Sequence, residues 1–145
     1  MNDHATVDHE ELLCLLLTAA ARATANAYRP GLARLGLTFA QFSVLVVLWG
    51  DDGLCGSDLA ARLQLDASTL SPLLRRMEAM GLVARHRCPD DERRVRVHLT
   101  DAGKALREPA RHVARDVSSR LELSEGDAAV LRRLARQVVE SGTAT

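Results

Sequence analysis

Apolar residues in the first third of the chain recur with the spacing of helices. From Val7 to Arg29 the sequence is rich in leucine and alanine, which predicts a helix with a hard stop at Pro30-Gly31. Leucines surround the axis of this helix, so it needs partners on all sides, either in a deep core or in another subunit. Thr38 is a candidate N-cap for a second, buried helix from Phe39 to Trp49, which ends at Gly50-Asp51-Asp52-Gly53.

A short helix followed by a longer one is predicted next. Ser57–Leu63 has the pattern of a short amphipathic helix, and Asp66 is a candidate N-cap for a helix that runs to Met80 and is closed by Gly81. Three or four residues join the two helices, which is the layout of a helix-turn-helix. The longer helix sets the polar residues Ser68, Thr69, Ser71, Arg75 and Arg76 around the apolar residues Leu70, Leu73, Leu74 and Met77.

The segment after Gly81 predicts a two-stranded hairpin. The stretches LVARHRC and VRVHLT flank a charged tip, Pro89-Asp90-Asp91-Glu92-Arg93. A helix-turn-helix followed directly by a hairpin is a winged helix. The sequence therefore predicts a winged helix-turn-helix, a DNA-binding domain, over residues 36–100.

Two more helices are predicted after the hairpin. Thr100-Asp101 starts a long helix, and Ser124 with Asp127 resembles a capping box that opens the last one. Their apolar positions step by three and four, as in Leu131, Leu134 and Val138. Such seams fit a helical dimer interface, and an internal bundle has the same spacing. We expect a mainly α fold with a small β-hairpin wing, in which residues 1–35 and 101–145 form a helical dimerisation region.

Charge is unevenly distributed along this neutral chain. Its 145 residues carry 19 basic and 19 acidic side chains, so the total does not indicate a nucleic-acid partner. Between Arg75 and Arg96, however, there are seven arginines and four acidic residues, whereas residues 1–30 have two arginines and four acidic residues. Arginine suits bidentate contacts to phosphate and guanine, so we expect a basic reading head beside an acidic N-terminus.

The predicted reading head assigns roles to individual residues. The helix from Asp66 would enter a major groove, and the wing tip would bring Arg93 or Arg94 to a backbone or a minor groove. Asp91 would orient these two arginines. The side chains expected to face DNA are Ser68, Thr69, Ser71, Pro72, Arg75, Arg76, Asp91, Arg93 and Arg94.

Composition and cysteine usage exclude several classes of protein. With 47% hydrophobic and 26% charged residues the chain is not disordered. The longest apolar run has about ten residues, where a membrane span needs about twenty. Three cysteines without a signal peptide favour a cytoplasmic protein with reduced thiols. Neither His4, His9 and Cys14 nor His86, Cys88 and His98 have structural zinc spacing, so we expect no metal or cofactor.

Several motifs together resemble MarR-type winged-helix repressors. They are LAARL at Leu59, DASTLSPLLRRME at Asp66, GLVAR at Gly81 and PDDERRVRVHLT at Pro89. The segments LLCLLL, AYRP and LGLTFAQF look most like the OhrR subgroup of organic hydroperoxide sensors. This subgroup is a homodimer that releases its operator when one N-terminal cysteine is oxidised. The resemblance implies that Cys14 is the reactive cysteine and that Tyr28 holds its thiolate.

Two positions depart from the pattern of that subgroup. Phe39 replaces a second sensor tyrosine and cannot donate a hydrogen bond. Thr18 replaces another tyrosine one turn after Cys14, where its hydroxyl would either face the thiol or bond to the Cys14 carbonyl. Cys14 and Tyr28 lie 14 residues apart, about 21 Å along a helix, so they meet only if the first helices of two subunits run antiparallel.

Three hypotheses for function follow. The first is a homodimeric repressor that binds an inverted-repeat operator in double-stranded DNA and releases it when an organic hydroperoxide oxidises Cys14. Since no cysteine follows Cys88, a small thiol would then form a mixed disulfide with Cys14, and Cys55 and Cys88 are read as incidental. The second is a MarR-type repressor released by a phenolic or other lipophilic ligand. The third, a thiol peroxidase, lacks an active-site motif, so we expect no enzyme.

Overall fold

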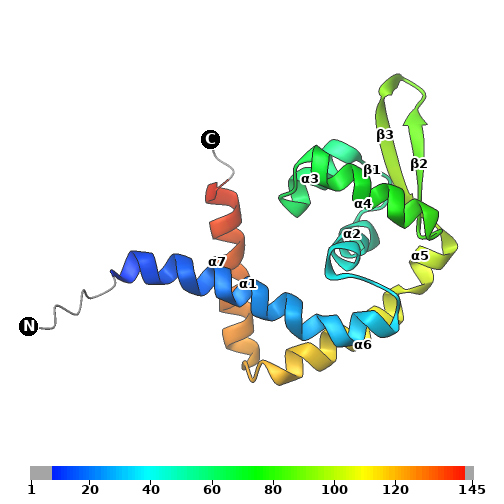
Figure 1. Ribbon diagram of the computed structural model, residues 1–145. Coiled ribbons are helices and arrows are strands. Elements are labelled where there is room, and N and C mark those ends of the chain that lie inside the picture. The colour runs from blue at the N-terminus through cyan, green and yellow to red at the C-terminus, as the bar shows by residue number, and fades with distance from the viewer. Residues whose placement is uncertain (1–7, 143–145) are drawn as a thin grey trace, which may run out of the picture. The chain divides into compact units, whose positions relative to one another are not determined.

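Seven helices and three strands make up residues 8–142, the part of the chain that the computed structural model describes (Figure 1). The chain divides into two compact units, residues 1–113 and 114–145. The elements are α1 (His9–Arg34), α2 (Phe39–Gly50), β1 (Leu54–Cys55), α3 (Gly56–Leu63), α4 (Ala67–Ala79), β2 (Val83–Cys88), β3 (Asp91–Leu99), α5 (Asp101–Ala105), α6 (Arg107–Arg120) and α7 (Glu125–Gly142). The mainly helical fold with a small β-hairpin wing is confirmed.

The hard stop predicted at Pro30-Gly31 is wrong, because α1 continues through both residues to Arg34. Proline removes one helical hydrogen bond, but fully buried Leu32 on the next turn anchors the end of the helix in the core. Gly31 is needed for close packing, since a Cβ there would lie 2.6 Å from a methyl group of Val113. Gly36, two residues after the end of α1, has a positive φ of 70°, which lets the chain turn away from the helix.

Helix α2 is the centre of the hydrophobic core of the first unit. It begins at the predicted N-cap Thr38, whose hydroxyl accepts a bond from the Gln41 backbone while the Gln41 side chain accepts one from the Thr38 backbone. Leu45 and Leu48 on α2 are almost completely buried. At the end of α2 the Trp49 indole donates a hydrogen bond to the Gly103 carbonyl at 3.0 Å, which ties α2 to α5.

Helices α3 and α4 form the predicted helix-turn-helix. Asp66 occupies the N-cap position of α4, although its side chain makes no capping hydrogen bond. Helix α4 ends just before Gly81. The apolar positions predicted for α4 are all buried: Leu70, Leu73, Leu74 and Met77.

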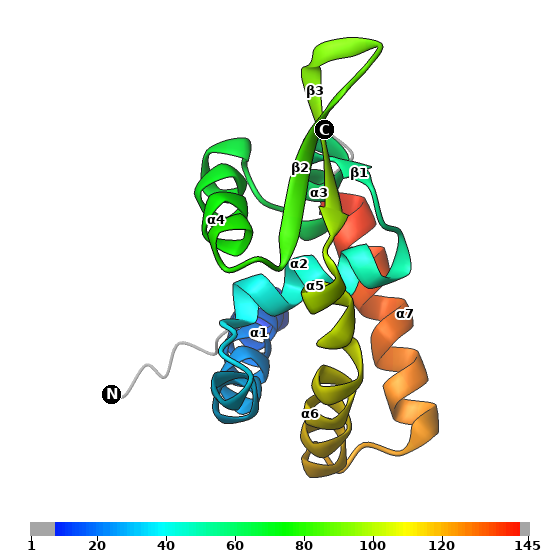
Figure 2. The same cartoon turned by 90° about the vertical axis from the view of Figure 1, so that its right-hand side faces the viewer.

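The wing is a hairpin of β2 and β3 in a three-stranded antiparallel sheet with the order β1-β3-β2. Figure 2 shows the hairpin projecting beyond α3 and α4. His86 pairs with Arg96, and the register shifts between Arg87 and Cys88 near the tip. Strand β1 was not predicted, because two residues are too short to show an alternating pattern. It pairs Cys55 with Arg96 of β3.

The long helix predicted after the wing is two helices, α5 and α6, which break at Leu106. Pro109 accounts for the break, because its ring clashes with the carbonyl four residues earlier, that of Ala105, and it has no N–H to donate. The prediction of one continuous helix is therefore wrong at this point.

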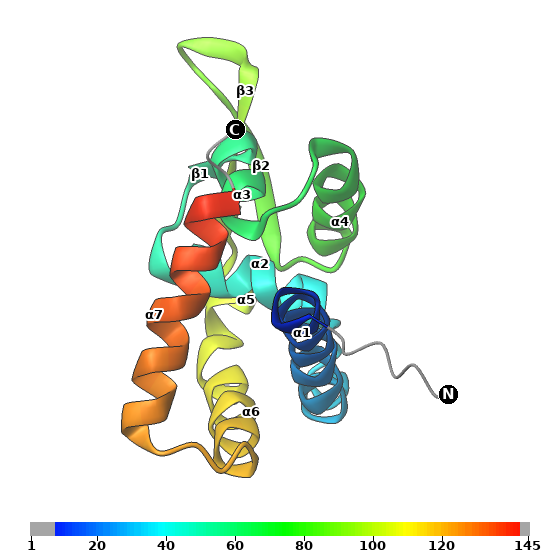
Figure 3. The same cartoon turned by 90° about the vertical axis from the view of Figure 1, so that its left-hand side faces the viewer.

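The second unit contains the end of α6 and helix α7. The chain reverses direction between them, as Figure 3 shows. Ser124 opens α7 as predicted, since its hydroxyl accepts a hydrogen bond from the Asp127 backbone at 3.1 Å. Within residues 8–142 no single helix is long and apolar enough to cross a membrane, and α1 and α2 pass that test only together, as a pair bent by 85°.

Candidate nucleic-acid interface and thiol site

The face of α4 opposite the core carries the polar residues that the sequence assigned to DNA. Pro72 is half-buried, and the others are exposed: Ser68, Thr69, Ser71, Arg75 and Arg76. Burial of the apolar residues on the other side of α4 fixes the direction in which these side chains point. Among the described residues, neither the guanidinium of Arg75 nor that of Arg76 has an ion-pair or hydrogen-bond partner, so both remain available for a ligand.

The wing tip presents Arg93 next to Asp91. The carboxylate of Asp91 accepts a hydrogen bond from the backbone N–H of Arg93 at 3.0 Å. Asp91 therefore shapes the backbone that carries Arg93 and does not hold its guanidinium. The Arg93 side chain has no hydrogen-bond or ion-pair partner within residues 8–142, and it is exposed.

Arg94 lies differently from its neighbour. Its Nη2 atom donates a hydrogen bond to the sulfur of Cys55, with 3.3 Å between nitrogen and sulfur. The charge of the Cys55 sulfur is the largest cause of a raised pKa for Arg94. Sequence reasoning missed this contact because 39 residues separate the partners and β1, which brings Cys55 to the wing, carries no sequence signal.

A salt bridge joins α4 to the wing. Glu78 of α4 accepts hydrogen bonds from the Nε atom of Arg85 in β2 at 2.9 Å and from its backbone N–H at 3.4 Å. The same pair forms a salt bridge of 2.8 Å. These hydrogen bonds from Arg85 lower the pKa of Glu78 from its usual 4.5. The contact sets the position of the hairpin relative to α4, so it positions the two elements expected to meet DNA.

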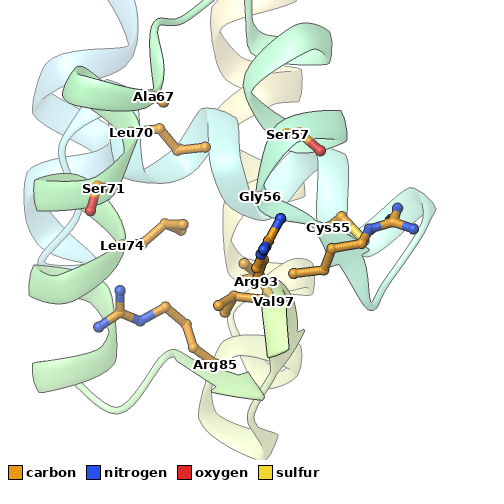
Figure 4. Close-up of a pocket in the computed structure, with 12 residues that line it drawn as sticks. Cys55, Gly56, Ser57, Ala67, Leu70, Ser71, Leu74, Arg85, Arg93 and Val97 are labelled. Carbon is orange, nitrogen blue, oxygen red and sulfur yellow. Dashed lines mark hydrogen bonds between the residues drawn. The ribbon is translucent and has the colours of Figure 1, made fainter. Parts of the chain in front are cut away.

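A cavity of about 430 Å³ lies between α3, α4 and the wing. Figure 4 shows Leu70 and Leu74 pointing from α4 towards the cavity, with Cys55 on the other side. Further lining residues include Ser71 and Arg93, which belong to the proposed DNA-binding face. The cavity thus combines apolar walls, a thiol and arginine side chains.

Cys14 lies on the exposed part of α1. Every residue from His9 to Ala23 is exposed, and the thiol is free. Of the two roles considered for Thr18, the structure shows the backbone one, because its hydroxyl donates to the Cys14 carbonyl at 2.9 Å. Since Cys14 and Tyr28 belong to one continuous helix, the structure keeps them far apart within the chain.

Tyr28 belongs to a cluster of aromatic rings where α1 meets α2. Its ring packs against Phe39 with centroids 5.5 Å apart and against Phe42 with centroids 5.2 Å apart. Phe42 in turn contacts Trp49 at 6.3 Å. Burial raises the pKa of the Tyr28 hydroxyl. Within residues 8–142 that hydroxyl has no hydrogen-bond partner, so it can donate to a group of another molecule.

Large apolar side chains are exposed at both ends of the chain. Leu15 and Leu16 on α1 are 63% and 57% exposed, and Leu131 on α7 is 53% exposed. The predicted seam residues Leu134 and Val138 are exposed as well. A soluble monomer rarely leaves so much apolar surface uncovered.

Two histidines of the wing lie close together. The ring centroids of His86 on β2 and His98 on β3 are 5.6 Å apart. Among residues 8–142 no group of three or more His, Cys, Asp or Glu side chains is arranged to hold a metal ion. His4, the first residue of the other histidine set, lies outside the described residues.

Known proteins similar to this chain are transcriptional regulators. TtmR of Methylorubrum extorquens (strain PA1) is 48% identical over 95 residues, 66% of this chain and 49% of TtmR, so the chain spans about half of that relative. The organic hydroperoxide resistance transcriptional regulator of Bacillus subtilis (strain 168) is 39% identical over 108 residues, 74% of this chain and 72% of that protein. MgrA of Staphylococcus aureus is 34% identical over 133 residues, 91% of this chain and 90% of MgrA.

Solved structures share the fold. Reduced AbfR bound to DNA has a TM-score of 0.74 and 29% identity, covering 89% of this chain and 90% of that one. A MarR transcriptional regulator from Methanosarcina mazei Go1 has a TM-score of 0.81 over 91% of this chain and 96% of that one; at 22% identity it supports the fold alone.

The family follows from the sequence match together with the fold. Residues 26–108, more than half of the chain, match the family described as "Transcriptional regulator SarA/Rot". That segment runs from the end of α1 through the helix-turn-helix and the wing to the start of α6. The resemblance to OhrR-like regulators of the MarR type is confirmed by the match to the organic hydroperoxide resistance transcriptional regulator of Bacillus subtilis. The chain belongs to the SarA/Rot family of transcriptional regulators and is a DNA-binding winged-helix protein of the MarR type.

Proposed function

We propose that the chain is a homodimeric repressor that releases its operator when an organic hydroperoxide oxidises Cys14. The observation that carries this proposal is an exposed, free thiol within the leucine-rich surface of α1. The similarity to the organic hydroperoxide resistance regulator of Bacillus subtilis supports the nature of the signal.

The geometry of α1 leads to the dimer. Cys14 and Tyr28 lie about 21 Å apart along one helix, so no change of side-chain rotamer brings them into contact within one chain. When two copies of α1 pack antiparallel, the thiol of one chain comes beside the partner subunit's Tyr28. The unpartnered hydroxyl of Tyr28 then has an acceptor, and the exposed leucines are covered.

The chemistry at Cys14 needs no group beyond the reactants. The thiolate sulfur attacks the terminal oxygen of the hydroperoxide, the O–O bond breaks, and the alkoxide takes a proton and leaves as an alcohol. The product is a sulfenic acid, which condenses with a small thiol to a mixed disulfide and water. Each protein chain consumes one hydroperoxide, which distinguishes this sensor from a peroxidase.

Oxidation inside a dimer interface acts on DNA binding through the distance between the two reading heads. A dimer reads an inverted repeat with half-sites about 10 base pairs apart, so a shift of one subunit against the other disrupts both contacts together. The exposed polar face of α4 and the free guanidinium of Arg93 supply the DNA contacts. The chain acts in the cytoplasm, where its operator is.

A binding series with and without hydroperoxide tests the proposal. An operator duplex selected from a random pool is titrated with the full chain before and after cumene hydroperoxide treatment, and then after a reducing thiol. The wild type should lose binding and regain it, Cys14→Ser should stay bound, and Cys88→Ser, which replaces a buried thiol, should respond like the wild type.

Two outcomes would contradict this function. Equal release of Cys14→Ser by hydroperoxide removes the sensor assignment. Release by a phenolic ligand that is indifferent to alkylation of Cys14 identifies the chain as a ligand-responsive repressor of the same fold.

A further inference from the structure

Cys55 and Arg94 form a thiol–guanidinium pair that the chemistry at Cys14 does not use. The Arg94 Nη2 atom lies 3.3 Å from the sulfur, and Cys55 is only 4% exposed. Cys55 also occupies the N-cap position of α3, where the backbone N–H groups of the helix carry partial positive charge. Cys55 thus lies between a positively charged side chain and the N-terminus of a helix, the kind of surroundings in which reactive cysteines of proteins are found.

The cavity beside this pair determines which reactants reach the sulfur. It measures about 430 Å³, and Leu70, Leu74 and Val97 form apolar walls. Figure 4 shows these walls around the space that Cys55 also lines. A small molecule with an apolar body fits the walls, and an oxygen acceptor on it would face the guanidinium of Arg94.

We propose that Cys55 is a second, independent modification site of this regulator, which takes small Michael acceptors of the quinone class. The thiolate sulfur adds to the β-carbon of the ring and forms an S–C bond. The π electrons of the C=C bond move to the carbonyl oxygen, where Arg94 donates a hydrogen bond. A proton from solvent then completes the adduct, so the step needs no oxidant or reductant.

Oxidation suits Cys55 less well than this addition. A disulfide within the chain would need a second cysteine nearby, and the other buried cysteine, Cys88, lies on β2 with β3 between β1 and β2. Neighbouring strands are about 4.8 Å apart, so Cys55 and Cys88 are separated by about 10 Å, whereas a disulfide needs Cα atoms within about 7 Å. Addition of a carbon electrophile is complete in one step and needs no second thiol.

An adduct at Cys55 would change the proposed DNA-binding face. It fills a cavity whose walls include Ser71 and Arg93, and it alters the sulfur to which Arg94 is bonded. We therefore expect modification to weaken DNA binding without any change at Cys14. This consequence rests on the DNA contacts proposed above, whereas formation of the adduct does not.

Mass spectrometry tests the site itself. The full chain carrying Cys14→Ser is treated with one equivalent of 2-methyl-1,4-benzoquinone, and the adduct is located by peptide mapping. We expect one adduct at Cys55 and none at Cys88. Arg94→Gln should slow the addition about tenfold, the effect of losing one charge-assisted hydrogen bond to the thiolate. The matched control Arg87→Gln removes a wing arginine outside the cavity and should leave the rate unchanged.

A DNA-binding measurement with the same quinone tests the regulatory consequence. Treated Cys14→Ser should lose its operator, and treated Cys14→Ser/Cys55→Ser should keep it, with Cys55→Ala as a second variant and circular dichroism as the check of folding. An adduct at Cys88, or a rate indifferent to Arg94→Gln, overturns the site. An adduct at Cys55 that leaves DNA affinity unchanged overturns the regulatory consequence. If the untreated chain binds no DNA, the proposed function fails while the mass spectrum still decides the site.

Discussion

Neighbouring arginines of the wing have different environments. Arg93 presents a free guanidinium at the tip, whereas Arg94 is hydrogen-bonded to Cys55 and Arg96 to the Gly53 carbonyl. The sequence run Arg93-Arg94 identifies a basic tip and does not distinguish the two arginines, because the partner of Arg94, Cys55, lies 39 residues earlier in the chain. Contacts between residues so far apart follow from the tertiary fold and not from local spacing.

Arg93→Ala is expected to weaken operator binding by about 1 to 3 kcal/mol if the side chain enters a groove. Because one cation fewer displaces counterions, the slope of log Kd against log salt should decrease by about one. Titrations of a labelled operator at several salt concentrations measure both quantities. Arg111→Ala, in a surface ion pair of 3.6 Å on α6, is the control. An unchanged affinity would remove the wing tip from the DNA interface.

At the proposed sensor site the sequence predicted which residues would take part, but not which groups each of them contacts. The resemblance identified Cys14 and Tyr28, and the helical spacing showed that they cannot meet within one chain. That Thr18 bonds to the backbone, and that Phe39 completes a ring cluster around Tyr28, depended on side-chain rotamers and on α2 packing, which spacing does not encode.

At the scale of the elements, two prolines in helical segments have different effects, so proline alone does not predict where a helix ends. Pro30 lies inside a continuous α1, and Pro109 accompanies the break between α5 and α6. The local penalty is the same at both sites, but fully buried Leu32 holds the turn after Pro30 in the core. The helix-turn-helix was predictable because its apolar positions recur at helical spacing, and the hairpin because apolar and polar positions alternate along its strands. Strand β1 was not predictable because it has two residues.

The Glu78–Arg85 contact between α4 and β2 makes a pH-dependent contribution to stability. Since Arg85 lowers the pKa of Glu78, the folded chain holds this proton less tightly than the unfolded chain. The contribution is therefore fully present above 4.5, the ordinary value, and is lost as the pH falls through the lower folded value. Thermal unfolding of the wild type and Glu78→Gln should differ at neutral pH and converge in acid.

Arg85→Gln provides the control for this comparison. In that background Glu78→Gln should have no pH-dependent effect on the unfolding temperature, as a double-mutant cycle requires. A pH-dependent difference that persists there would assign the low pKa of Glu78 to another group.

On the scale of the whole molecule, the arginine-rich segment of the wing and the exposed apolar side chains lie on different elements. The segment from Arg75 to Arg96 carries seven arginines against four acids, and most of the exposed leucines and valines lie on α1 and α7. Net neutrality therefore conceals a basic reading head, and the apolar helices give the surfaces on which a second copy would pack.

Leu134→Arg tests the proposed dimer. Leu134 lies on the exposed apolar seam of α7, and burying an unpaired arginine between subunits is costly. We expect the variant to sediment as a monomer and to bind the operator more weakly than the wild type. Ala129→Arg adds the same charge on the opposite face of α7 and should remain dimeric. A wild type that sediments as a monomer at all concentrations would refute the homodimer.

Trp49, whose indole donates a hydrogen bond to the Gly103 carbonyl, is an intrinsic fluorescent probe of the protein. Trp49 is the only tryptophan in the chain, so all indole fluorescence comes from the point where α2 meets α5. Its neighbour Phe42 also contacts Tyr28 on the helix that carries Cys14. A rearrangement that travels along these rings would change the emission of a single fluorophore, and it could be followed in real time without attaching a dye.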